Sequence, residues 1–271
     1  MSMARERLWQ AAEWTLLRVG AGVSLASRLG LLEIKTLLVI LLLAGAGWGF
    51  AELADEVGEG ETRSFDEAVL LAMREPGDTN DPVGPRWFEE AARDVTALGG
   101  LVVLLIVTAS SAAYMLLGRR PRMALLLTLS VIGAQILSSA LKHGFARPRP
   151  ELVAHEAYVY TASFPSGHSV MAAATYLTLG ALLAQVQSRR RQKMFLLGLA
   201  MALALLVGMS RIYLGVHWPT DVLAGWTVGA GWAALVWLVA RILQRQGMLR
   251  HASGETEIPP PSESSSSSNV T

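Results

Sequence analysis

Three short polar clusters interrupt the apolar second half of this sequence, and they contain the residue types that perform acid–base and nucleophilic chemistry. They lie at residues 142–150, 165–168 and 210–221. Lysine, arginine, histidine and aspartate are all represented, whereas the segments between the clusters are almost purely apolar. Because ionisable groups beside apolar spans are costly, a functional site is the default interpretation of such clusters.

The cations of these clusters are suited to holding a phosphate group. Arg149 and Arg211 can each donate two hydrogen bonds to phosphate oxygens, and Lys142 adds a point charge. Together they can stabilise the charge that a phosphoryl group carries during transfer. Ser166 and Gly167 stand where a helix is expected to begin, so free backbone N–H groups and the helix dipole offer a further anion site.

Two histidines can divide the remaining chemistry of phosphoryl transfer. Attack on phosphorus requires a neutral imidazole, and the departing oxygen requires a proton donor. Asp221 follows His217 by one helical turn, so its carboxylate can accept from one ring nitrogen while the other attacks. We therefore assign His217 as nucleophile, Asp221 as the residue that orients it, and His168 as general acid.

The three clusters resemble the motifs of the type 2 phosphatidic acid phosphatase (PAP2) superfamily, which includes membrane lipid phosphate phosphatases and vanadium haloperoxidases. The matching residues, which agree in type, order and spacing, are Lys142 with Arg149-Pro150, Pro165-Ser166-Gly167-His168, and Ser210-Arg211 with His217 and Asp221. The resemblance implies a phosphohistidine intermediate on His217 and no required metal or other cofactor. The phosphate contacts that it implies come from Lys142, Arg149, Ser166, Gly167, His168 and Arg211.

A second arginine, Arg147, duplicates the Arg-Pro pair of the first cluster. It does not keep the family's distance from Lys142, so the sequence favours a loop or lipid-headgroup contact for it.

The elements that must position these residues are apolar segments. The chain of 271 residues is 52% hydrophobic, which is unusual for a soluble domain, and a membrane-spanning helix needs about 20 apolar residues. Six such segments are expected at 36–54, 95–117, 123–142, 168–187, 194–212 and 221–243. The predicted fold is therefore an all-α, polytopic membrane protein with a PAP2-type bundle of six transmembrane helices. Glycines of the last span, at 225, 229 and 231, are expected to allow close helix packing.

Charge between the spans predicts the orientation in the membrane. Lys and Arg gather in the N-terminal arm, at 119–122, at 189–193 and after the sixth span, and the positive-inside rule places such segments in the cytoplasm. The loop 55–94, rich in Asp and Glu, then faces outward. We expect an integral plasma (inner) membrane protein with both termini cytoplasmic and the active site on the extracytoplasmic face.

Three regions are expected along the chain. Residues 1–35 have the apolar spacing of an amphipathic helix lying on the membrane surface, and residues 36–248 form the six-span domain. The Ser/Pro-rich residues 249–271 form a disordered tail. Within the outer loop 55–94, a short helix is expected from Phe65 to Met73, but no function is assigned to this loop.

The sequence as a whole predicts a membrane lipid phosphatase acting on a lipid phosphate monoester or pyrophosphate. In a bacterium the candidates are undecaprenyl pyrophosphate, phosphatidic acid and phosphatidylglycerol phosphate, with a slight preference for the first because that carrier is recycled on the outer face. Two alternatives stay open: a lipid phosphotransferase that uses the same His217 intermediate, and a non-catalytic transporter or scaffold that binds anionic lipids.

Composition limits the partners and chemistries further. The expected partners are a lipid phosphate and membrane lipids, since a net charge of +1 provides no basis for nucleic-acid binding. The absence of cysteine excludes disulfides, thiolate metal sites and a cysteine nucleophile. The sequence does not specify an oligomeric state.

Overall fold

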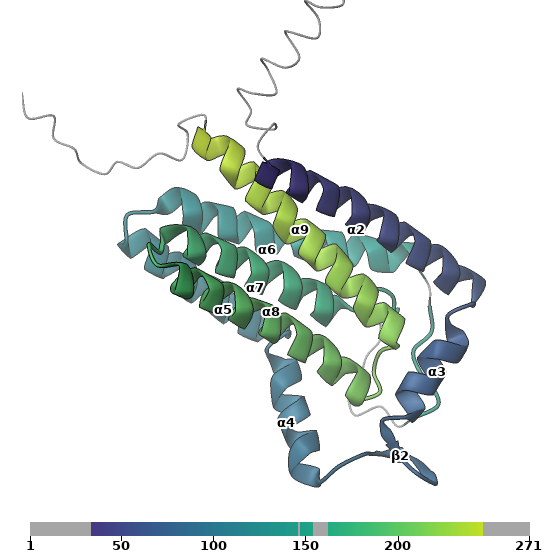
Figure 1. Ribbon diagram of the computed structural model, residues 1–271. Coiled ribbons are helices and arrows are strands. Elements are labelled where there is room, and N and C mark those ends of the chain that lie inside the picture. Colours follow the sequence, from purple (N-terminus) through teal and green to yellow (C-terminus); the bar gives the residue numbers. More distant parts are fainter. Residues whose placement is uncertain (1–33, 146, 154–161, 246–271) are drawn as a thin grey trace, which may run out of the picture.

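A computed structural model describes residues 34–145, 147–153 and 162–245. The predictions for the N-terminal arm up to residue 33 and for the tail from residue 249 fall outside these ranges. Most of the described chain is helical, which confirms the all-α class (Figure 1). In chain order the elements are α2 (Ile34–Glu59), α3 (Arg63–Leu71), β1 (Arg74–Glu75), β2 (Asp78–Pro82), α4 (Arg86–Ala97), α5 (Leu101–Leu117), α6 (Pro121–Gly144), α7 (Gly167–Val186), α8 (Arg190–Tyr213) and α9 (Pro219–Arg245).

The bundle is built around α7, which packs against α6, α8 and α9. Helix α2 lies on the outer side of α9, and α5 packs against α6 (Figure 1). The burial of α7 reflects its central position. Within an apolar stretch of 18 residues, 67% of α7 is buried inside the protein, whereas only 6% of the corresponding stretch of α2 is buried. The residues at the start of α7 are therefore surrounded by other helices, whereas α2 presents most of its surface outward.

Five of the described helices, α2, α6, α7, α8 and α9, are long and apolar enough to cross a membrane, and α4 with α5 makes a sixth candidate. The span predicted at 95–117 is not a single straight helix, because α4 and α5 are bent by 53° at a break over residues 98–100. A Cβ on Gly99 would lie 2.4 Å from Val207 Cγ1 and 3.3 Å from His168 Cβ. The chain can pass so close to α7 and α8 only because this residue has no side chain.

Helices α7 and α9 approach each other closely through the glycines predicted for this purpose. A Cβ on Gly225 would lie 2.8 Å from the carbonyl oxygen of Ser166, and one on Gly229 would lie 2.6 Å from that of Val170. The two backbones are therefore in contact, which brings the first turns of both helices together. Gly231 differs, since a Cβ there would have only an ordinary contact, with α2.

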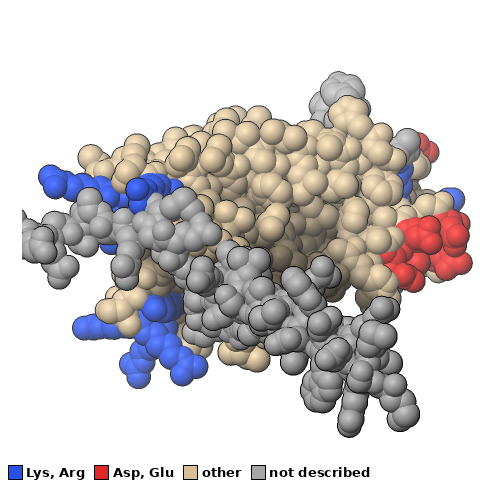
Figure 2. Space-filling model, turned by 90° about the horizontal axis from the view of Figure 1, so that it is seen from above, with Lys and Arg blue, Asp and Glu red and all other residues tan. Residues whose placement is uncertain are grey.

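The short elements between α2 and α5 gather at one end of the bundle. The predicted short helix is present as α3. A hairpin of β1 and β2, which the sequence does not predict, turns at Gly77 with a φ of 98°. Figure 2 shows Asp and Glu collected at one end of the molecule, while Lys and Arg gather toward the opposite end. This separation of charge along the bundle is what the sequence predicts, but the side of the membrane that each end faces remains a prediction.

Candidate active site

The turn between α8 and α9 positions two of the predicted site residues. Arg211 lies in the last turn of α8, and Val216 N donates to its carbonyl oxygen at 3.2 Å. Gly215 has a φ of 71°, the left-handed conformation that glycine adopts readily after a helix end. The chain therefore reverses within a few residues, and His217 follows the turn almost fully buried.

The start of α9 fixes Asp221 beside His217. The helix begins at Pro219, a residue type that suits the first turn of a helix. Asp221 in this turn accepts a hydrogen bond from the backbone N–H of Trp218 at 3.0 Å. This is half of a capping box, in which a first-turn acid reaches back to the preceding N–H. The same carboxylate oxygen, Oδ2, lies 3.3 Å from Nδ1 of His217, so the predicted contact between these two residues is present.

The other ring nitrogen of His217 faces a cation. Nη1 of Arg149 lies 3.2 Å from Nε2 of His217 and donates to the carbonyl oxygen of Val216 at 2.6 Å. A guanidinium can only donate, so Nε2 is the acceptor and the ring proton belongs on Nδ1, toward Asp221. In this tautomer Nε2 carries the free electron pair that an attack on phosphorus requires.

The three cations that the sequence predicts to bind phosphate all interact electrostatically with His217. Lys142 comes from α6, Arg149 from the loop that follows it, and Arg211 from α8. Burial lowers the pKa of His217 well below its usual value of 6.5, and the cations lower it further. His168, from α7, interacts with the same cations and with His217. The structure therefore brings the residues of all three sequence clusters into one site.

The first turn of α7 lies in this site. Ser166 is the N-cap residue, and its backbone N–H donates to the carbonyl oxygen of Asp221 at 3.0 Å, which ties α7 to α9. A Cβ on Gly167 would lie 3.2 Å from Cε of Lys142, so the lysine side chain crosses the beginning of the helix. Lys142 Nζ donates to the carbonyl oxygen of Ala162 at 3.3 Å. The helix N-terminus and the lysine thus offer N–H donors and positive charge at the same place.

Arg211 is almost completely buried, with 4% of its surface exposed. Its Nη1 donates to Oγ1 of Thr96 on α4 at 3.1 Å, whereas its Nε has no hydrogen-bond partner among the described residues. A buried donor without a partner is costly, and a phosphate oxygen would satisfy it. The contact with Thr96, which the sequence does not predict, makes the bent α4–α5 element a part of this site.

Arg147 makes contacts that the sequence does not predict. The sequence favours a loop or headgroup contact for it, but its guanidinium forms ion pairs with two buried carboxylates, Asp221 at 2.7 Å and Asp66 at 2.6 Å. Asp66 belongs to α3, within the outer loop 55–94 to which no function was assigned. It is one of many acidic residues in that loop, and nothing in its local sequence distinguishes it from the others.

Comparison with known proteins identifies the family. The model of the PAP2 superfamily matches residues 123–245, which include all three polar clusters. Phosphatidylglycerophosphatase B of Bacillus subtilis is 33% identical over 188 residues, which cover 66% of this chain and 85% of that protein. The chain belongs to the PAP2 superfamily.

Two further comparisons agree with this membership. An undecaprenyl-diphosphatase of Sulfolobus acidocaldarius is 32% identical over 148 residues, or 50% of this chain and 68% of that protein. The crystal structure of a transmembrane PAP2-type phosphatidylglycerolphosphate phosphatase from Bacillus subtilis aligns with a TM-score of 0.66 and 31% identity, covering 72% of this chain and 93% of that one. The chain is therefore an integral, multi-pass membrane enzyme of the PAP2 phosphatase type, as its sequence predicts.

Proposed function

We propose that this protein hydrolyses a lipid phosphate or pyrophosphate through a covalent phosphohistidine on His217. The observation that carries the proposal is the arrangement of the imidazole: Nδ1 lies 3.3 Å from the Asp221 carboxylate and Nε2 lies 3.2 Å from the Arg149 guanidinium. One nitrogen is thus held by a carboxylate, and the other is directed toward the cations suited to a phosphate.

In the first step the phosphate is bound by Lys142, Arg149 and Arg211, together with N–H groups at the start of α7. Nε2 of His217 attacks phosphorus, the nitrogen–phosphorus bond forms, and the bond from phosphorus to the lipid oxygen breaks. His168, which must carry a proton when the phosphate is bound, donates it to the departing oxygen. The cations stabilise the charge on the transferring group, and Asp221 stabilises the positive charge that the ring acquires.

In the second step a water molecule attacks phosphorus from the side vacated by the lipid. His168, now neutral, takes a proton from this water, and the bond from phosphorus to Nε2 of His217 breaks. Inorganic phosphate is released, and both histidines return to their starting states. The same intermediate would serve a phosphotransferase if an alcohol replaced the water.

The lipid nature of the substrate is supported by the position of the site and by the relatives. His168, Arg211 and Asp221 lie at the ends of helices that are apolar enough to span a membrane, so a headgroup at the membrane surface can reach them. The names of the relatives refer to phosphatidylglycerophosphate and undecaprenyl diphosphate. These two lipids and phosphatidic acid are therefore the substrates to test first, with the site on the extracytoplasmic face.

The test is release of inorganic phosphate from these lipids by the purified protein in detergent. We expect release without an added acceptor, and a loss of more than about 10⁴-fold in His217→Ala, as is typical when a nucleophile is removed. His143→Ala is the matched control, because His143 is exposed and its Nδ1 pairs with the Ser139 carbonyl oxygen of its own helix. Rapid quenching should trap an acid-labile phosphoenzyme in the wild type but not in His217→Ala.

Other outcomes of this experiment have distinct meanings. Phosphate transfer that requires an added alcohol would identify a phosphotransferase. Wild-type activity in His217→Ala would overturn the covalent mechanism, and binding of the lipids without any turnover would favour the scaffold alternative.

A further inference from the structure

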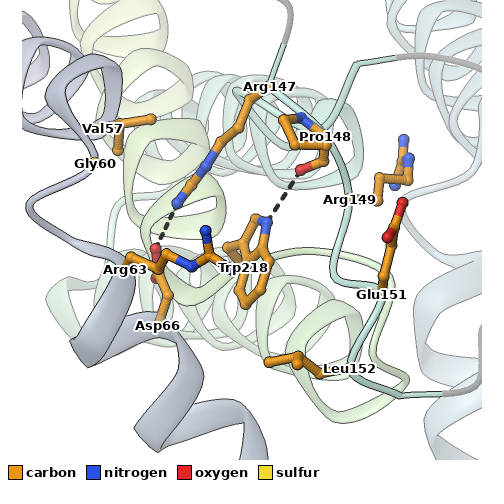
Figure 3. A pocket seen from close by; sticks show the side chains of 10 residues that line it. All are labelled: Val57, Gly60, Arg63, Asp66, Arg147, Pro148, Arg149, Glu151, Leu152 and Trp218. Atoms are coloured by element: carbon orange, nitrogen blue, oxygen red, sulfur yellow. Dashed lines mark hydrogen bonds and ion pairs between the residues drawn. The ribbon is translucent and has the colours of Figure 1, made fainter.

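The guanidinium of Arg147 is held between two buried carboxylates from different parts of the chain. Nη1 donates to Oδ1 of Asp221 on α9 at 2.7 Å, and Nη2 donates to Oδ2 of Asp66 on α3 at 2.6 Å (Figure 3 shows the second bond). Both carboxylates are 0% exposed and the arginine side chain is 14% exposed. Such short, charge-assisted bonds away from water are among the stronger polar contacts in proteins.

The two carboxylate oxygens of Asp221 have different partners. Oδ1 accepts from Arg147, while Oδ2 accepts from the backbone N–H of Trp218 and faces Nδ1 of His217. The arginine therefore opposes rotation of the carboxylate away from the imidazole. Because Oδ2 must keep its position for the ring to keep its tautomer, Arg147 can influence the orientation of His217 through Asp221.

Asp66 binds not only Arg147 but also Thr220, the residue that precedes Asp221. Its Oδ1 accepts from the backbone N–H of Thr220 at 2.9 Å, and its Oδ2 accepts from the Thr220 hydroxyl at 2.7 Å. That hydroxyl also accepts from Nη1 of Arg147 at 2.8 Å. Asp66 therefore satisfies an N–H group at the start of α9, which has no partner within the helix, and fixes α3 to the residue that precedes Asp221.

Arg147 also lines a pocket of about 440 Å³, together with Arg149 and Trp218 (Figure 3). Its guanidinium lies 5.6 Å from the centre of the Trp218 ring. A headgroup contact would require a substrate to compete with the two carboxylates for the same N–H groups. The geometry favours support of the nucleophile over recognition of the substrate, and the two roles predict different kinetic changes.

We propose that Asp66 and Arg147 are positioning residues for the nucleophile: Asp66 holds Arg147, Arg147 holds Asp221, and Asp221 holds His217. The proposal rests on the function of His217 proposed above. One guanidinium between two carboxylates leaves a net charge of −1, so Asp66 also offsets the positive charge that Arg147 places beside Asp221. Without Asp66, that uncompensated charge would make the Nε2 atom of His217 less basic.

The charged and titratable groups that interact with His217 come from several helices and a loop. They are Lys142 of α6, Arg149 of the following loop, His168 of α7, Arg211 of α8 and Asp221 of α9. Because the cations of this set disfavour a proton on the imidazole, the basicity of the nucleophile depends on the carboxylates at its other side. A change at Asp66 or Arg147 should therefore be visible in the pH dependence of the reaction.

The experiment compares Asp66→Asn, Arg147→Gln and the double variant with Glu67→Gln in the full-length protein. Glu67 is the adjacent acid on α3 and pairs with the exposed Arg63 at 2.8 Å, an interaction of little energetic weight. We expect the two single variants to lower kcat by about 10- to 100-fold, by analogy with the residues that orient metal-bound histidines, with KM unchanged. The double variant should lose less than the product of the two single losses, because Asp66 acts in part through Arg147.

The pH profile separates positioning from a purely structural role. In Asp66→Asn the acid limb of kcat/KM should move to lower pH, since the uncompensated guanidinium disfavours the imidazolium, whereas in Arg147→Gln it should move to higher pH. Active sites are counted by trapping the phosphoenzyme, so partial unfolding reduces the number of sites without altering kcat per site or the shape of the profile. A loss confined to the number of sites would overturn the proposal.

Two further results would also overturn it. A raised KM with unchanged kcat in Arg147→Gln would show that Arg147 contacts the headgroup. Wild-type kinetics in Asp66→Asn would show that Asp66 does not help to position the nucleophile. If Asp66→Asn does not fold, Arg147→Lys provides the same test: it keeps the charge but cannot span both carboxylates as a guanidinium does, so kcat per site should fall. Failure of the proposed function is distinct, because the wild type and Glu67→Gln would then release no phosphate either.

Discussion

The Nε2 atom of His217 lies 3.2 Å from Nη1 of Arg149. The nitrogen expected to attack phosphorus therefore already faces a cation expected to hold the phosphate. A phosphate oxygen bound by this guanidinium would bring its phosphorus next to the nucleophile without a large movement of either side chain. Reacting groups held in this way before the substrate arrives avoid much of the entropic cost of the reaction, and the fixed cations stabilise the transition state without reorganising.

The pH dependence of the reaction should follow the charge around His217. Its pKa lies well below 6.5 because of burial and the neighbouring cations, so the imidazole is neutral above pH 6.5 and the acid limb of kcat/KM due to this group lies below that pH. Removing a cation raises the pKa, so in Arg149→Gln the acid limb should move to higher pH while kcat/KM falls at all pH values. An acid limb in the same position as in the wild type would contradict the assignment of this group.

The importance of His168 should depend on the leaving group. In His168→Gln we expect hydrolysis of a lipid phosphate to slow by about 10²- to 10⁴-fold, because an alkoxide needs a proton as it departs. Hydrolysis of p-nitrophenyl phosphate should slow much less, since nitrophenolate leaves without one. Initial rates on the two substrates provide the comparison, and equal losses would argue against a general acid at this position.

Contact between α7 and α9 should make Gly225 intolerant of a side chain. A Cβ there would lie 2.7 Å from Ser169 Cβ, so we expect Gly225→Ala to destabilise the protein by about 1–3 kcal/mol, as for an overpacked core. Gly198→Ala is the control, since a Cβ on exposed Gly198 would meet nothing within 4 Å, and alanine is the better helix former. In detergent, the melting temperature should fall for Gly225→Ala, and it should stay the same or rise for Gly198→Ala.

Catalysis should not require a divalent metal. Among the residues that the structure describes, no group of three or more His, Asp or Glu side chains is placed to hold one, and a hard cation needs several oxygen ligands. We expect phosphate release to persist in EDTA. Complete loss of activity that Mg²⁺ restores would contradict this prediction.

The orientation in the membrane can be read from introduced cysteines, because the chain has none of its own. Asn80 on the hairpin and Gln192 at the start of α8 are both exposed and lie in segments predicted to face opposite sides. Asn80→Cys should react with an impermeant thiol reagent in intact cells, and Gln192→Cys should react only after lysis. The reverse pattern would place the site in the cytoplasm.

Several features of the site could be predicted because they depend on short stretches of chain. His217 and Asp221 are one helical turn apart, so helix geometry alone brings them together once α9 begins at Pro219. Lys142, His168 and Arg211 each lie at the end of an apolar segment, and the alternation of spans across a membrane brings these ends to one side. The break at Gly99 was not predictable, because it depends on how closely α7 and α8 approach that residue.

The sequence alone determined the family and most of the helices of this protein, because motif spacing, hydrophobic segments and helix-start residues are local features of the chain. Only the tertiary structure decided that Asp66, among the many acids of its loop, meets Arg147. These residues are 81 positions apart, and their pairing depends on how α3 packs against the start of α9. Such a contact between distant elements leaves no periodic or local pattern in the chain, so it becomes visible only when the helices are in place.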